Sequence, residues 1–305
     1  VYFDRFIIGL PAVQWLADAD EQQVLRLWEG LGCYRRARQM HKAAKVIVTD
    51  HHGVFPHRVA ELQALPGIGR YTAGAIASIA FDQPAPIVEA NTIRLFARLF
   101  GFSGDTAASA GQRLLWSFAE EIIPKKEVVR VNQALMELGA LICTPKLPLC
   151  DACPAMALCP TFENGWQADI PAPKQKMQFE AVSEAAVVIR RGEKVLLRRC
   201  EENERWAGLW DFPRVATSAT GSARTKEVAE KISQQIGAKV SIGQRLTTLK
   251  HGVTRFRITL TCYEGTCTAP DAKPNATTLR WMPIDKLADV PLSTTGRKLA
   301  SLVLS

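Results

Sequence analysis

The stretch LPGIGRYTAGAI at residues 65–76 decides the fold of the first half of the chain. Two glycines stand between helical stretches, and glycine permits a tight turn whose backbone N–H groups can approach a phosphate closely. The helix that follows adds the positive end of its dipole. The stretch therefore predicts a helix–hairpin–helix that holds a phosphate backbone without reading bases, although an ordinary helix–helix turn shares the bare glycine pattern. The residues expected to bind are Gly67, Ile68, Gly69 and Arg70.

Four cysteines form a compact loop further along, at Cys143, Cys150, Cys153 and Cys159, with the spacing C-x6-C-x2-C-x5-C. Four thiolates in one loop can surround an iron–sulfur cubane, because thiolate is the ligand that such clusters use. A structural zinc site would favour two close C-x2-C pairs, and this loop has one. A disulfide pair is the other alternative, but the remaining cysteines show no framework pattern. We expect a 4Fe-4S cluster.

Length and composition bound the class of protein. A chain of 305 residues is long for a single core, so two domains are expected. With 47% hydrophobic and 22% charged residues the composition is ordinary for a globular protein, and no apolar run approaches the length of a membrane span. The net charge of +8 favours a polyanionic partner.

Residues 1–162 read as one helical domain, because apolar side chains recur at helical spacing and no segment alternates as strands do. Helices are expected at Glu21–Gly30, Arg35–Val48, Val59–Ala64, Tyr71–Ala80, Asn91–Leu99, Ala110–Ile122 and Val131–Ile142. The chain opens with Val1 inside an amphipathic stretch, Tyr2–Ile7, so we expect a fragment that lacks upstream residues.

The second half has a different pattern. Gly165, Pro171 and Pro173 interrupt regular structure, which predicts a linker over residues 163–178. Residues 179–305 then show strand-like alternation, which predicts an α+β domain. Strands are expected at Ala185–Ile189, Lys194–Arg198, Gln244–Leu249, Thr254–Cys262 and Thr278–Met282, and helices at Thr225–Ile236 and Thr294–Leu304.

Several of these segments together resemble a known family. Leu65–Ile76, Pro86–Asn91 and the cysteine loop resemble the endonuclease III superfamily, and within it the adenine DNA glycosylases of the MutY type. Leu27–Arg38 and Asn132–Ala140 are similar to the same branch, so the resemblance covers nearly the whole chain. It implies an all-α helix-hairpin-helix glycosylase domain with an iron–sulfur loop, followed by an α+β Nudix-like domain. Members remove adenine paired with 8-oxoguanine after flipping the adenine out of the stack.

The resemblance implies a catalytic group of Glu89, Asn91 and Tyr71. Breaking an N-glycosidic bond builds positive charge on the sugar, which a carboxylate can stabilise or trap. Glu89 stands where the family usually has Asp, and its alternative role is that of a helix-start acid without chemistry. Asn91 would orient Glu89 or cap the helix, and Tyr71 would line the sugar and base pocket or pack as a half-buried aromatic.

The absence of two family lysines distinguishes this chain from relatives that also cut the DNA strand. Relatives that also cut the strand use a lysine amine, in the position that Tyr71 occupies here, and a second family lysine is replaced by Ile93. A phenol forms no Schiff base, so we expect a monofunctional glycosylase. The family's upstream helix, with its general-acid Glu and base-contacting Gln residues, is absent from this sequence, so we expect the chain as given to bind DNA but to cleave poorly.

DNA contacts are also expected from a basic helix and from the loop before it. The resemblance places Cys33 where the family usually has a wedge tyrosine, with Tyr34 next to it. A thiol stacks on bases far less than an aromatic ring does. Arg35 and Arg36 begin a run of positive charge that is expected to contact phosphate.

The second domain resembles the family's Nudix-like domain, which helps to recognise 8-oxoguanine. Gln234 and Gln235 stand where Nudix hydrolases have metal-binding carboxylates, and neutral amides replace carboxylates poorly around Mg²⁺, so nucleotide hydrolysis is not expected. Thr254 and Arg255 lie where the family has its lesion-reading loop; the alternative is a plain β-hairpin.

The function that these features predict is excision of adenine mispaired with 8-oxoguanine or guanine, with double-stranded DNA as the partner. Two alternatives stay open: a catalytically impaired fragment that binds mismatched DNA, and another base glycosylase of the endonuclease III type. Activity on 8-oxoguanine:adenine and guanine:thymine duplexes would separate them. We expect a cytoplasmic, nucleoid-associated monomer without a membrane segment.

Overall fold

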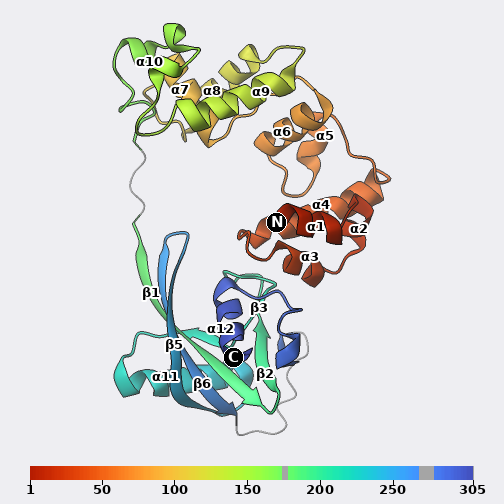
Figure 1. Cartoon of the computed structure of the whole chain (residues 1–305), viewed down its shortest axis with the longest axis vertical. Helices are drawn as coiled ribbons and strands as arrows, with labels where there is room; N and C mark the ends of the chain where they lie inside the picture. Colours follow the sequence, from red (N-terminus) through yellow and green to blue (C-terminus); the bar gives the residue numbers. More distant parts are fainter. Residues whose placement is uncertain (174–177, 268–277, 305) are drawn as a thin grey trace. The chain divides into compact units, whose positions relative to one another are not determined.

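The computed structural model describes residues 1–173, 178–267 and 278–304, which divide into two compact units. The helical unit spans residues 46–176, and the sheet unit combines residues 1–45 with residues 177–305 (Figure 1). The predicted fold class, a helical region followed by an α+β region, is confirmed. The two units do not follow the predicted boundaries at residues 162 and 179, because the first helices pack with the sheet.

The helical unit is built around α7, whose sequence alternates buried and exposed faces at helical spacing. Leu95, Phe96 and Ala97 lie in its core with Leu115 of α8. Ile170, inside the predicted linker, is 2% exposed and packs into the same core, so the chain still belongs to this unit there. Its elements are α4 (Tyr34–Asp50, which enters from the sheet unit), α5 (Val59–Ala64), α6 (Arg70–Phe81), α7 (Ala90–Phe100), α8 (Ser109–Ile122), α9 (Val128–Glu137), the π-helical η1 (Leu138–Ile142), the 3₁₀ turns η2 (Cys150–Ala152) and η3 (Met156–Leu158), and α10 (Pro160–Glu163).

The sheet unit contains a mixed sheet in the order β3-β2-β1-β6-β5, with β4 paired to β1 and β7 paired to β2. β1 and β6 run parallel, and the other pairs are antiparallel. The elements are β1 (Glu180–Arg191), β2 (Lys194–Arg199), β3 (Trp210–Asp211), β4 (Arg214–Ala216), α11 (Gly221–Ile236), β5 (Val240–Val253), β6 (Phe256–Cys267), β7 (Leu279–Pro283), η4 (Ile284–Lys286) and α12 (Thr294–Leu304).

A central strand buried on both faces explains the run of apolar residues in β1. Ala185 and Val187 point into the cluster that contains Val228 of α11. Ala186 and Val188 belong to the opposite cluster, which contains Leu299 of α12. Successive side chains of a strand point to opposite faces, so α11 and α12 cover the two sides of the sheet.

The first helices belong to the sheet unit through polar contacts with it. They are α1 (Tyr2–Gly9), α2 (Val13–Asp18) and α3 (Glu21–Trp28). Gln22 donates to the carbonyl oxygen of Gly208 at 2.9 Å and accepts from the indole of Trp210 at 2.8 Å. Arg26 donates to the carbonyl oxygen of Ala288 at 2.6 Å. Sequence patterning gave no sign of this packing, because it does not rest on apolar periodicity.

Most predicted helices and strands are confirmed within a few residues, with two differences. The predicted helix Val131–Ile142 ends as an α-helix at Glu137 and continues as η1. The predicted strand Thr254–Cys262 is wrong at its start, since residues 254 and 255 form the turn between β5 and β6. Residues 174–177 of the predicted linker lie outside the described residues. Among the helices described, none is long and apolar enough to cross a bilayer.

Candidate active site and cysteine pocket

Glu89 caps the N-terminus of α7 and keeps one carboxylate oxygen free. Its Oε1 accepts from the backbone N–H of Asn91 at 2.8 Å and of Thr92 at 3.1 Å. The Thr92 hydroxyl in turn accepts from the Glu89 N–H at 2.8 Å, which completes a capping box. In the part of the chain that the structure describes, Oε2 has no hydrogen-bond partner. Glu89 therefore caps the start of α7, as the alternative role predicted, and its Oε2 is still available for another interaction.

A close approach of two segments positions Glu89. A Cβ on Gly74 of α6 would collide with the carbonyl oxygen of Pro86, so only glycine lets α6 lie against the strand-like segment that leads to Glu89. From the other side, the buried side chain of Asn132 on α9 donates to the carbonyl oxygen of Ala85 at 2.8 Å. The hairpin motif and the α9 motif thus both fix the segment before Glu89.

Among the described residues, the Asn91 side chain makes no hydrogen bond to Glu89, although the resemblance predicted one that would orient the carboxylate. The backbone of Asn91 does so instead, and its Oδ1 accepts from Arg94 Nη2 at 3.0 Å. Arg94 also donates to the carbonyl oxygens of Cys143 at 2.7 Å and Gly139 at 2.5 Å. Arg94 therefore joins the start of α7 to the first cysteine.

Arg98 is a buried cation beside the cysteine loop, and sequence reasoning missed it. It is 3% exposed and donates to the carbonyl oxygens of Ile170 at 2.8 Å, Thr144 at 2.8 Å and Gln167 at 2.7 Å. Its Nη1 also lies 3.4 Å from the sulfur of Cys143. No carboxylate among the described residues pairs with it, which leaves its charge without a formal counter-charge.

The four loop cysteines line one pocket beside α7. The pocket has a cavity volume of about 30 Å³, and its wall includes Leu95, Arg98 and Gln167. None of the four forms a disulfide, so that alternative is wrong. Across the described ranges, no three or more His, Cys, Asp or Glu side chains lie close enough together to hold a metal ion. Burial raises the pKa of the Cys150 thiol, and the neighbouring cysteines raise it further.

The hairpin turn is exposed, as a backbone-binding turn requires. Gly67 adopts φ +77°, and Gly69 caps α6 without any side-chain bond to the first amides of the helix. Arg70 is already engaged, in an ion pair with Glu120 and 3.9 Å above the ring of Trp116. Tyr71 is 42% exposed, so it is not a core aromatic. The open amides, rather than the Arg70 side chain, make this turn suited to bind an anion.

The basic face of α4 lies within the sheet unit. Arg35 and Lys42 are exposed, and with Arg38 they line a pocket that also contains Arg199 of β2. Arg36 is exposed and lies 6.0 Å from the ring centroid of Trp28. In the described part of the chain, no carboxylate forms an ion pair with any of these α4 cations, so they are available for phosphate.

The loop before α4 presents a cysteine rather than an aromatic ring. Cys33 is exposed with φ +46°, in the left-handed region. The Tyr34 hydroxyl is buried instead, and burial raises the pKa of this phenol. The Tyr34 side chain as a whole is half-buried, so its predicted DNA contact stays a prediction.

Thr254 and Arg255 form the exposed turn of the hairpin between β5 and β6. The Thr254 hydroxyl donates to the carbonyl oxygen of Val253 at 2.7 Å. Arg255 lies 3.7 Å from the carboxylate of Glu180, with both side chains largely exposed. Residues 254 and 255 thus form the turn of a β-hairpin, which was the alternative to a lesion-reading loop, and the turn carries the Arg255 cation.

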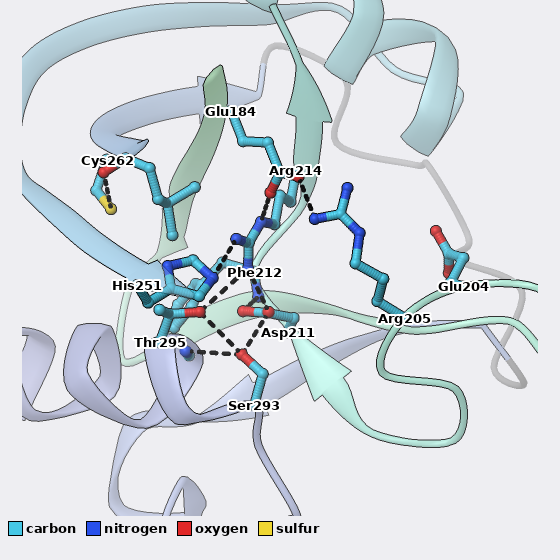
Figure 2. A network of polar contacts seen from close by, with 12 residues as sticks. Glu184, Glu204, Arg205, Asp211, Phe212, Arg214, His251, Cys262, Ser293 and Thr295 are labelled. Atoms are coloured by element: carbon cyan, nitrogen blue, oxygen red, sulfur yellow. Dashed lines mark hydrogen bonds and ion pairs between the residues drawn. The ribbon is translucent and has the colours of Figure 1, made fainter. Parts of the chain in front are cut away.

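A buried network occupies the region of the sheet unit that contains Asp211 (Figure 2). Arg214 donates to Glu184 Oε2 at 2.5 Å and to Asp211 Oδ2 at 3.3 Å. Arg205 pairs with the other oxygen of Glu184 at 2.8 Å. Burial raises the pKa of Asp211, against the opposing effect of Arg214 and the Ser293 hydroxyl. Burial and the nearby Arg214 cation lower the pKa of His251.

Gln235 belongs to the framework of this network. Its side chain accepts from the Arg214 N–H at 3.3 Å and donates to the Arg214 carbonyl oxygen at 3.2 Å. Gln234 is exposed on the same helix, α11. Both glutamines therefore lie on α11, and Gln235 holds the backbone of Arg214 in place.

Both halves of the chain are similar to known proteins. The family model described as HhH-GPD superfamily base excision DNA repair protein matches residues 2–121, and a NUDIX domain model matches residues 185–302. An adenine DNA glycosylase of Mus musculus is 28% identical over 347 residues, covering 98% of this chain and 67% of the relative. One from Buchnera aphidicola subsp. Schizaphis graminum is 35% identical, covering 71% of this chain and 62% of the relative.

Among solved structures, a thermostable thymine-DNA glycosylase is similar, with a TM-score of 0.49 and 28% identity over 53% of this chain and 75% of that one. The two family models and the curated relatives confirm the predicted class of enzyme, a DNA N-glycosylase of base excision repair. The chain thus contains an HhH-GPD domain over residues 2–121 and a NUDIX domain over residues 185–302, and it is similar to the adenine DNA glycosylases.

Proposed function

We propose that the protein excises adenine mispaired with 8-oxoguanine or guanine in double-stranded DNA, as a monofunctional glycosylase. Loss of adenine leaves positive charge on the deoxyribose, and a fixed carboxylate stabilises that charge. The base must first leave the stack, because its glycosidic bond is not accessible inside a duplex. Glu89 would act on the sugar, and the hairpin turn and the α4 cations would hold the strands.

The geometry of Glu89 carries this proposal. Backbone amides of α7 bind only its Oε1, so Oε2 remains available to the sugar. The helix dipole favours the ionised carboxylate, which is the form that the chemistry needs. Tyr71 lies at the exposed start of α6 without an amine, which supports base removal without strand cutting. Its phenol cannot form the Schiff base that strand-cutting relatives use.

The residues of the cysteine pocket fit a 4Fe-4S cluster. Four cysteines line one pocket, and thiolate is the ligand that iron–sulfur clusters use. The loop has only one C-x2-C pair, whereas a structural zinc site would favour two. Arg98 is buried without a carboxylate partner, and an anionic cluster would supply the missing charge. The cluster would cross-link the loop after η1, and Arg94 would transmit that order to the start of α7.

Metal analysis of the purified protein tests the cofactor. We expect about four iron and four sulfide per chain and a brown colour, with both lost in Cys150→Ser. Cys33→Ser is the matched control, because Cys33 is exposed and remote from the pocket in sequence, and it should keep its iron. Active protein that is colourless and loaded with zinc would contradict the cluster.

A single-turnover assay on four duplexes tests the activity. We expect adenine to be released slowly from 8-oxoguanine:adenine and guanine:adenine pairs, because this sequence lacks the general-acid helix that the resemblance implies, and strand breaks should appear only after alkali. Guanine:thymine and guanine:cytosine duplexes should stay intact. Thymine release would favour another endonuclease III-type glycosylase, and strand cutting without alkali at the rate of excision would refute the monofunctional assignment. Tight binding without release would support the mismatch-binding alternative.

A further inference from the structure

The loop of residues 30–33, here called the tip loop, has an unusual backbone. Gly30, Gly32 and Cys33 adopt φ values of 99°, 67° and 46°, all in the left-handed region. For a residue with a Cβ, such as Cys33, this conformation is strained and persists only where neighbours hold it. The indole of Trp28 donates to the Gly32 carbonyl oxygen at 2.9 Å, which supplies part of that support.

Glu29 anchors the base of the tip loop. Both of its carboxylate oxygens accept from Arg297 of α12, at 2.7 Å from Nε and 2.9 Å from Nη2. The two side chains are 11% and 26% exposed, respectively. A paired geometry of this kind, with two parallel charged hydrogen bonds, is both stronger and more directional than a single contact.

Arg297 is itself fixed from behind. It donates to the carbonyl oxygens of Leu287 at 2.6 Å and Val290 at 2.7 Å. Its helix packs Leu299 and Ala300 into the core beside the sheet. A continuous set of contacts therefore runs from the core of the Nudix-like domain through Arg297 and Glu29 to the tip loop.

We propose that the Glu29–Arg297 ion pair is a positioning contact for lesion recognition. It holds the tip loop on the same compact unit that carries the Thr254–Arg255 turn, so that preference for the damaged pair depends on it. The inference rests on the proposed function and deepens it: Glu29 and Arg297 act through the loop and need not touch DNA. Removing the charge of Glu29 leaves Arg297 with carbonyl partners only, and removing the charge of Arg297 leaves Glu29 with the more distant Arg26 at 3.6 Å and the Leu292 N–H at 3.4 Å. Either change weakens the anchor of the loop.

Duplex binding by Glu29→Gln, Arg297→Gln and the double variant tests the proposal. The readout is the ratio of Kd for a guanine:cytosine duplex to Kd for an 8-oxoguanine:adenine duplex. We expect each single variant to reduce this ratio about tenfold, a size ordinary for coupling between sites, and the double variant to lose no more than a single one. Glu227→Gln is the matched control; its ion pair with Lys231 lies within α11 and should leave the ratio unchanged.

Amide hydrogen exchange gives a second readout that needs no DNA. Glu29→Gln should speed exchange at residues 30–34 while the amides of β1 and β6 keep their protection. Unchanged exchange there would overturn the proposal, as would a wild-type Kd ratio in the single variants. An equal loss of affinity for both duplexes would also overturn it, because that result reports general damage to the fold. If the wild-type protein binds both duplexes equally, the proposed lesion specificity is wrong. If the wild-type protein prefers the 8-oxoguanine:adenine duplex and the variants keep the same Kd ratio, only the inference about Glu29 and Arg297 is wrong.

Discussion

Glu89 in the helical unit and Asp211 in the sheet unit are both held by hydrogen bonds, yet their environments differ. Glu89 is half-buried, and backbone amides bind only one of its oxygens. Asp211 is 3% exposed; its Oδ1 accepts from the Phe212 N–H, and its Oδ2 accepts from Arg214 and Ser293. A carboxylate that reacts needs an unoccupied oxygen, and of these two only Glu89 has one.

The difference extends to counter-charge. Arg214 faces the buried carboxylates Glu184 and Asp211, so the sheet unit balances its internal cation by itself. Arg98 in the helical unit contacts carbonyl oxygens and the sulfur of Cys143. Because a buried charge is costly unless it is paired, the sheet unit should be stable without a cofactor, whereas the cysteine pocket should depend on one.

The largest expected effect comes from breaking the network of the sheet unit. Arg214→Met leaves Glu184 and Asp211 buried with less compensation, which should lower the free energy of unfolding by about 3–5 kcal/mol. Denaturant unfolding measured with and without iron checks this, because the loss should be the same in both. Arg255→Met is the control: Arg255 is exposed and should change stability by less than about 0.5 kcal/mol. A small loss for Arg214→Met would mean that the network is not a source of stability.

Salt should act on the exposed charges and not on the buried network. If the α4 cations and the hairpin turn contact about four phosphates, log K should fall with log salt with a slope of about −3.6. That slope weakens binding about 10²-fold between 50 and 200 mM salt. Arg35→Gln should make the slope shallower by about 0.9. An affinity that does not change with salt would rule out phosphate binding by these residues.

The smallest expected effect concerns a third carboxylate, Glu227, and the dependence of stability on pH. On α11, Glu227 accepts from Lys231 at 2.6 Å and from the Thr217 hydroxyl at 2.6 Å, and these bonds lower its pKa from 4.5 to about 2. A lowered pKa adds stability above pH 4.5 that is lost as the pH falls toward 2. Glu227→Gln should flatten the acid side of the stability curve. A steeper acid side in the variant would contradict the assignment.

The sequence predicts the parts of the fold that rest on local rules. The glycines of residues 65–76 specify the hairpin, and Gly74 proves to be required by the close approach of Pro86. The apolar run in β1 comes from burial on both faces, and the predicted strand Ala185–Ile189 lies within β1. The cysteine spacing also predicts a shared pocket, which the structure contains.

Contacts to backbone oxygens and contacts over long sequence distances leave no such pattern. Arg94 and Arg98 bind carbonyl oxygens, which every residue has, so their roles could not be found from residue types. The pair of Glu29 with Arg297 joins positions at opposite ends of the chain. Burial of the Tyr34 hydroxyl could not be predicted for a related reason, because it depends on packing that appears only in the folded unit.

The most direct test compares Glu89→Gln with Asp211→Asn on one 8-oxoguanine:adenine duplex under single-turnover conditions at saturating protein. Glu89→Gln should lose roughly 10²-fold or more in excision rate while Kd stays near wild type, because the charge is removed and the shape is nearly kept. Asp211→Asn, once shown to be folded, should excise at the wild-type rate. Wild-type excision by Glu89→Gln, or loss of excision only in Asp211→Asn, would contradict the account.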